Sequence, residues 1–193
     1  MPRIVDHDQR RREIVAVTKE IILQGGFEAA TMRSIAAAAG FANGALKHYF
    51  ASKESIVAGV FDDVLAAMTE AIGSGPGDGS LDGLRAHLEL MLPLDEQRIV
   101  NGRVLLALWE YAMSDPALAT RYRDHVASWR ASLVAVLGRC RASGAITLSA
   151  ADDDLASELI SVTIGAHVLS LISPLGELVE GYRRYIDSFI ARM

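Results

Sequence analysis

Apolar residues recur every three or four positions along most of the chain, a spacing that places them on one face of an α-helix. Ile14, Val17 and Ile21 mark such a face near the N-terminus. The following Gly25-Gly26 pair predicts the end of that helix, because glycine readily adopts the left-handed conformation of a helix cap. No segment alternates apolar and polar residues between hairpin turns, so no strand is predicted. The pattern predicts an all-α protein.

Shorter helices follow the first one. Thr31 is suited to cap a short helix that Gly40 closes, and a second short helix is predicted over about 43–50. Ser52 is suited to cap a longer connecting helix over about 52–72. Two short helices joined by a turn that opens with glycine form a helix-turn-helix unit, whose second helix fits the major groove of DNA.

The stretch GSGPGDGS, at residues 73–80, interrupts the helical pattern with four glycines and a proline. We interpret it as a connection and not as a phosphate-binding loop, because no strand precedes it and no G-K-[ST] follows. Beyond it the spacing predicts five helices, at about 81–92, 96–113, 116–142, 150–172 and 175–192. The sequence therefore divides into a helix-turn-helix domain at 1–54 and a larger helical domain at 55–193.

Six residues of the second short helix are the candidates to meet DNA. Leu46 and Phe50, four positions apart, face the core and leave the other positions outside. The cation, imidazole and phenol among them suit phosphate or base edges, while the small residues permit close approach. The candidates are Asn43, Gly44, Ala45, Lys47, His48 and Tyr49.

Charge is distributed unevenly and agrees with this division. The net charge is −5, yet residues 1–54 hold eight Lys/Arg against six Asp/Glu, which gives +2, and residues 55–193 hold the balance of −7. A basic head on an acidic body permits nucleic-acid binding by the head. A single cysteine, Cys140, excludes a disulfide framework, and the polar N-terminus lacks a signal peptide, so we expect a cytoplasmic protein.

The block from Thr31 to Glu54 contains T-x-R-x-I-A-x-x-A-G, L-x-x-Y-F and S-K-E. This order resembles the DNA-binding domain of TetR-family transcriptional regulators over about residues 10–60. The resemblance implies that Thr31 and Arg33 lie near the DNA and that Lys53 meets a phosphate. It also implies a homodimer on a palindromic operator and a small-molecule effector. The chain departs from the family pattern at Ala42, which weakens the cap unless Asn43 takes that role, and at Lys47, which shifts the contacts towards charge.

The last two predicted helices resemble the pair with which TetR-family subunits build a four-helix dimer interface. The helix at 150–172 carries apolar residues on nearly every side, and the helix at 175–192 is amphipathic. We predict the interface at Leu159, Val162, Leu171, Leu178, Tyr182, Tyr185 and Phe189. The segment WEYAMSDPALA resembles the choline-regulator branch of the family, without defining a ligand.

Most of the tryptophan and histidine, with several methionines, falls in the larger domain. Flat aromatic rings and adaptable methionines suit an apolar ligand held by few polar contacts, and the acidic balance favours a neutral or cationic one. We predict an effector pocket lined by some of His87, Met91, Trp109, Met113, His125, Trp129 and His167. No cofactor or metal is expected, because these histidines lack metal-ligand spacing and Asp152–Asp154 suit the dipole of a helix start.

Several other interpretations compete with this one. The uncharged stretch 159–176 reaches the lower limit of a membrane span, but it contains His167 and ends near Pro174, so a helix buried in protein is favoured. Cys140 stands between two arginines that could lower a thiol pKa, yet a structural role is favoured over redox sensing. A small helical enzyme and an effector-independent DNA-binding protein remain alternatives to a repressor that a small molecule releases from its operator.

Overall fold

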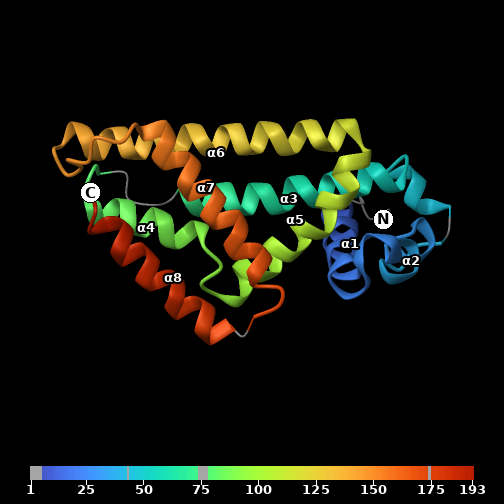
Figure 1. Ribbon diagram of the computed structural model, residues 1–193. Coiled ribbons are helices and arrows are strands. Elements are labelled where there is room, and N and C mark those ends of the chain that lie inside the picture. Colours follow the sequence, from blue (N-terminus) through green and yellow to red (C-terminus); the bar gives the residue numbers. More distant parts are fainter. Residues whose placement is uncertain (1–5, 43, 74–77, 174) are drawn as a thin grey trace. The chain divides into compact units, whose positions relative to one another are not determined.

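The computed structural model describes residues 6–42, 44–73, 78–173 and 175–193, and every regular element in these ranges is helical (Figure 1). The elements, in chain order, are α1 (His7–Ala29), α2 (Met32–Ala38), the 3₁₀ helix η1 (Ala45–His48), α3 (Lys53–Gly73), α4 (Leu81–Met91), α5 (Glu96–Ser114), α6 (Pro116–Ala142), α7 (Asp152–Leu169) and α8 (Leu175–Ile190). The all-α prediction is confirmed. No described helix is long and apolar enough to cross a membrane.

The chain divides into two compact units. The first comprises Met1–Ala66 and Val104–Leu118, and the second comprises Ala67–Arg103 and Ala119–Met193. Both α3 and α5 therefore contribute residues to each unit. The first unit holds the helix-turn-helix, while α4, α7 and α8 fall in the second, as does α6 from Ala119 onward.

Caps and glycines place the helices of the first unit much as the sequence predicts. Gly26, with φ of 73°, breaks the helical path of α1. Thr31 and Ser34 form a reciprocal cap at the start of α2: the Ser34 amide donates to Thr31 Oγ1 at 3.1 Å, and the Thr31 amide donates to Ser34 Oγ at 2.9 Å. Gly40, also with φ of 73°, turns the chain after α2.

The second helix of the helix-turn-helix differs from its prediction. The spacing predicts a helix over about 43–50, whereas the structure has a single 3₁₀ turn at Ala45–His48. Its flanking hydrogen bonds are short-range, from the Ala45 amide to Ala42 O and from the Tyr49 amide to Leu46 O. We call residues 44–49 the reading turn. Asn43, one of the predicted DNA contacts, lies outside the described residues.

The second unit is built on one apolar core formed by α4, α6, α7, α8 and the α6–α7 connection. Leu84, Leu133, Leu137, Ile186 and Phe189 are completely or almost completely buried in it. In Figure 1, α4 and α8 run beside each other, and the two helices are in contact. The acidic start of α7 is fixed to α6, because the Arg141 guanidinium pairs with Asp152 at 2.8 Å and also donates to Leu148 O and Ala150 O.

Cys140 lies at the edge of this core and is buried. Its thiol approaches Ser80 O at 3.4 Å. Burial raises the pKa of the Cys140 thiol, and this effect exceeds the opposing influence of Arg139. Arg139 thus lowers the thiol pKa as the sequence suggests, but burial outweighs it, and the structure favours a structural cysteine.

Candidate DNA interface and ligand site

The reading turn presents polar side chains around an apolar anchor. Leu46 is completely buried, and Phe50, just after the turn, is 3% exposed. Gly44, Lys47 and His48 are exposed, whereas Ala45 and Tyr49 are half-buried. The sequence prediction of which positions face inward therefore holds for the anchors, and the polar candidates of the turn lie at or near the surface.

Side chains from the first turns of α1 hold the reading turn in place. The Arg11 guanidinium donates to Tyr49 O and lies 4.0 Å from the centroid of the Phe50 ring. The His7 ring contacts the Tyr49 ring in a tilted arrangement, with 4.8 Å between centroids and 33° between planes, and His7 Nε2 lies 3.3 Å from His48 O. Sequence reasoning missed these contacts, although the basic run at Arg10–Arg12 was a visible signal at the start of the helix.

Among the described residues of the first unit, three exposed cations have neither an ion pair nor a hydrogen bond from the charged group: Arg12, Arg33 and Lys47. Arg33 lies in the first turn of α2, and Lys47 lies in the reading turn. Thr31, the other residue predicted near the DNA, is exposed but uses its hydroxyl to cap α2. Free cations on both elements of a helix-turn-helix suit contacts to phosphate and base edges.

Lys53 differs from these cations because its ammonium is already bound within the unit. Its Nζ donates to Phe27 O at 3.0 Å and lies 3.5 Å from the centroid of the Phe27 ring. The side chain is half-buried. The resemblance to TetR-family regulators implies a phosphate contact at this position, and the structure instead gives Lys53 two partners on α1.

Five of the seven predicted ligand residues lie in the second unit: His87, Met91, His125, Trp129 and His167. His167 Nε2 lies 3.2 Å from Met91 O and so connects α7 to the end of α4. The His125 and Trp129 rings stack at 6.2 Å on α6. The first of these contacts joins residues 76 positions apart, whereas the second lies within one helix.

Buried polar atoms without a partner mark this part of the second unit. His87 Nε2, Trp129 Nε1 and His167 Nδ1 are buried and make no hydrogen bond with the described residues. His87 is 4% exposed and His167 is 8% exposed. Because leaving a buried donor or acceptor unpaired costs about 1–3 kcal/mol, such atoms are suited to bind a polar ligand group or water.

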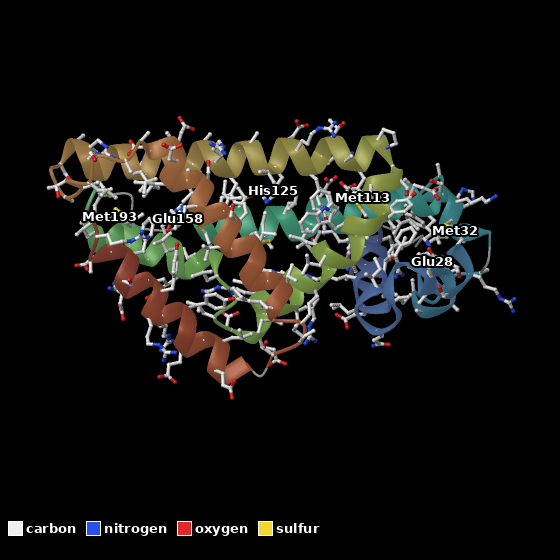
Figure 2. All side chains as sticks on the ribbon, viewed as in Figure 1. Glu28, Met32, Met113, His125, Glu158 and Met193 are labelled. Carbon is white, nitrogen blue, oxygen red and sulfur yellow. The ribbon has the colours of Figure 1, made fainter. Side chains whose placement is uncertain are left out.

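The remaining two predicted ligand residues, Trp109 and Met113, belong to the first unit. They are four positions apart on α5 and are 43% and 75% exposed. Figure 2 labels Met113, and also His125 on α6. The structure describes Trp109 and Met113 as surface residues, whereas the other five are buried or half-buried.

The predicted dimer residues also divide into two groups. Leu159 and Phe189 are 2% and 0% exposed, because the core of their own chain covers them, so they are not available to contact a second subunit. Val162, Leu178, Tyr182 and Tyr185 are half-buried, and Leu171 is exposed. The exposed apolar residues at the end of α7, which the sequence placed inside a longer helix, are Val168, Leu169, Leu171 and Ile172.

The buried imidazoles predict a loss of stability in acid. Burial lowers the pKa of both His87 and His167, and for His87 the nearby Arg139 charge lowers it further. The unfolded chain therefore binds more protons than the folded one below about pH 6.5, the ordinary imidazole pKa. We expect the unfolding free energy to fall as pH decreases from 7.5 to 5.5, measured by denaturant titration. His87→Leu should flatten this dependence, and an unchanged slope would contradict the assignment.

Comparison with known proteins agrees with this arrangement. The family model described as "Bacterial regulatory proteins, tetR family" matches residues 14–60, and the model described as "BetI-type transcriptional repressor, C-terminal" matches residues 81–193. The chain belongs to the TetR family. It is accordingly a DNA-binding transcriptional regulator, and repression relieved by an effector is typical of this family.

Individual relatives extend over nearly the whole chain. The HTH-type transcriptional regulator PksA of Bacillus subtilis is 29% identical over 189 residues, which are 96% of this chain and 90% of that protein. A TetR transcription regulator from Haloarcula marismortui has the same fold, with a TM-score of 0.86 at 20% identity, over 96% of this chain and 98% of that one.

A transcriptional regulator from Saccharomonospora viridis, whose structure holds choline, is similar in fold. Its TM-score is 0.83 at 20% identity, over 95% of this chain and 96% of that one. The match to the BetI-type C-terminal model covers the helices that build the apolar core of the second unit. The TetR resemblance predicted from the sequence is therefore confirmed.

Proposed function

We propose that this regulator is a homodimeric repressor that binds a palindromic operator through residues 1–54 and releases it when a small molecule binds within 55–193. The observation that carries the proposal is the pair of exposed, unpaired cations, Arg33 on α2 and Lys47 on the reading turn. Two such surfaces in a dimer match successive major grooves when they are roughly 34 to 36 Å apart. Selection of bound duplexes from a randomised pool tests this directly, since a palindrome is expected.

Lys47→Ala should weaken binding to all sequences by a similar factor. An exposed lysine at this position is suited to contact a phosphate, so its loss should reduce the salt dependence of the binding constant by about one unit in each half-site.

Arg33→Ala should act differently. It should relax the preference at one base pair, with a loss of about 1–3 kcal/mol in the binding free energy that discriminates against the wrong base. Affinities measured at several salt concentrations, with the selected sequence of each variant, separate the two roles. An unchanged sequence preference in Arg33→Ala would reduce Arg33 to a backbone contact.

The proposed effector pocket lies in the second unit around His87, Met91, Trp129 and His167. Three of these residues carry the buried polar atoms without a partner, and Trp129 Nε1 among them only donates. Among the described residues, no Asp, Glu, Lys or Arg is buried, and the lowered pKa of each buried histidine keeps it neutral at pH 7. We propose a neutral effector with an oxygen acceptor, because a cation would find no buried carboxylate here.

Choline offers a sharp test, because the Saccharomonospora viridis regulator binds it. We expect the neutral carbon analogue of choline, in which carbon replaces the nitrogen, to bind at a concentration about tenfold lower than choline itself. Binding is followed by Trp129 fluorescence in a Trp109→Phe variant, so that the exposed tryptophan of the first unit contributes no signal. Tighter binding of choline, accompanied by operator release, would contradict a neutral effector.

A further inference from the structure

Lys53 connects the two ends of the helix-turn-helix segment through a contact with Phe27. Phe27 precedes α2, and Lys53 follows the reading turn, so the hydrogen bond from Lys53 Nζ to Phe27 O joins residues 26 positions apart. Everything between them is α2, the reading turn and the residues that connect them. The spacing between the two ends of the DNA-reading segment therefore depends on this contact.

Phe27 is covered on both faces. Tyr111 of α5 stacks on it with 4.1 Å between ring centroids and 20° between ring planes. A ring at that distance leaves no room for an ammonium on the same face, so Lys53, at 3.5 Å, occupies the other one. Burial raises the pKa of the Tyr111 phenol, and so do the carboxylates of Glu54 and Asp115, which keeps the ring uncharged.

We propose that Lys53, Phe27 and Tyr111 form a clamp that positions the reading turn, with Lys53 acting as a positioning residue and not as a phosphate contact. Moving the ammonium to DNA would break both its hydrogen bond and its cation–π contact. The clamp thus explains why Lys53 is half-buried while Lys47 and Arg33 are exposed. The proposal rests on the DNA-binding function above for its readout.

The test measures how two variants bind a duplex that the wild-type protein selects. Lys53→Met breaks the clamp and removes a charge, whereas Phe27→Leu breaks it and leaves the charge unchanged. We expect Lys53→Met and Phe27→Leu to lower affinity by a similar factor, about tenfold, with the salt dependence of wild type retained in both. Lys47→Met is the control and should reduce the salt dependence by about one unit per half-site. Phe27→Tyr keeps an aromatic ring at this position and should bind the duplex with the affinity of the wild-type protein. A reduced salt dependence in Lys53→Met, with wild-type affinity in Phe27→Leu, would overturn the clamp.

Stability provides a readout that does not depend on DNA. Lys53→Met and Phe27→Leu should each lower Tm by about 3 °C, and the double variant should lower it by less than the two losses combined, because the residues share one contact. Additive losses would overturn the clamp even if no duplex is selected. Failure of the wild-type protein to select any duplex, with non-additive losses, would instead contradict the DNA-binding function and support the clamp.

Discussion

A variant that carries Leu171→Glu and Ile172→Glu is expected to be monomeric and to lose most of its operator affinity. The two side chains are 43% and 81% exposed at the end of α7, beside the amphipathic α8, so charging them leaves the core of the subunit intact. Burying four carboxylates at a two-fold interface opposes association. Because the two half-sites then bind independently, affinity should fall by about a hundredfold or more. Mass in solution and operator binding measure the two effects.

Met113→Glu is the matched control for this variant. Met113 is 75% exposed, but it lies on α5 in the first unit and is not one of the residues of the proposed interface. We expect this variant to remain dimeric. A folded Leu171→Glu, Ile172→Glu variant that keeps the mass of a dimer would remove the end of α7 from the interface.

Replacement of Gly102 by alanine is expected to destabilise the second unit strongly. The added Cβ would lie 2.3 Å from His167 Nδ1 and 3.0 Å from its Cγ. The imidazole is buried and fixed by its contact with Met91 O, so it has little freedom to move aside. Overpacking of this kind lowers the free energy of unfolding by about 1–3 kcal/mol, which should lower Tm by several degrees.

Two further variants make the Gly102 result specific. Gly138→Ala, on α6, places its Cβ at an ordinary 3.7 Å from Asp152 Oδ2, so alanine should be neutral or slightly stabilising there. Combining Gly102→Ala with His167→Ala removes the clashing ring and should recover part of the lost Tm. If Gly102→Ala proves as stable as Gly138→Ala, α5 and α7 do not pack as closely as described.

Local signals in the sequence were sufficient to place most helices. The Asp115-Pro116 pair marks the start of α6, which begins at Pro116 and ends at Ala142 as predicted. Thr31 caps α2, also as predicted. The helix predicted over 150–172 is shorter, because α7 ends at Leu169. The helix predicted over 43–50 is reduced to one 3₁₀ turn, in which the Ala45 and Tyr49 amides bond carbonyls only three residues back.

The contacts that define the site were less predictable, because they join residues distant in sequence. Leu159 and Phe189 were assigned to a dimer interface from an apolar pattern, but a pattern cannot tell whether the subunit's own core or a partner covers a face. Lys53 was assigned to DNA by resemblance alone, and its bond to Phe27 leaves no trace in local spacing. The exposed state of Lys47 did follow from spacing, since Leu46 and Phe50 determine which side of the turn faces the core, whereas Arg33 was indicated only by the family resemblance.

The support of the reading turn by His7 and Arg11 has a thermodynamic consequence for recognition. A single 3₁₀ turn has little stability of its own, so its backbone order is supplied by α1 before DNA arrives. Ordering a residue costs about 1–2 kcal/mol in conformational entropy, and here that cost is met during folding. We therefore expect association to be close to a rigid-body event, in which the turn does not change shape to accommodate a mismatched base pair. We therefore expect sequence discrimination to depend on the stability of α1, which holds the reading turn in place.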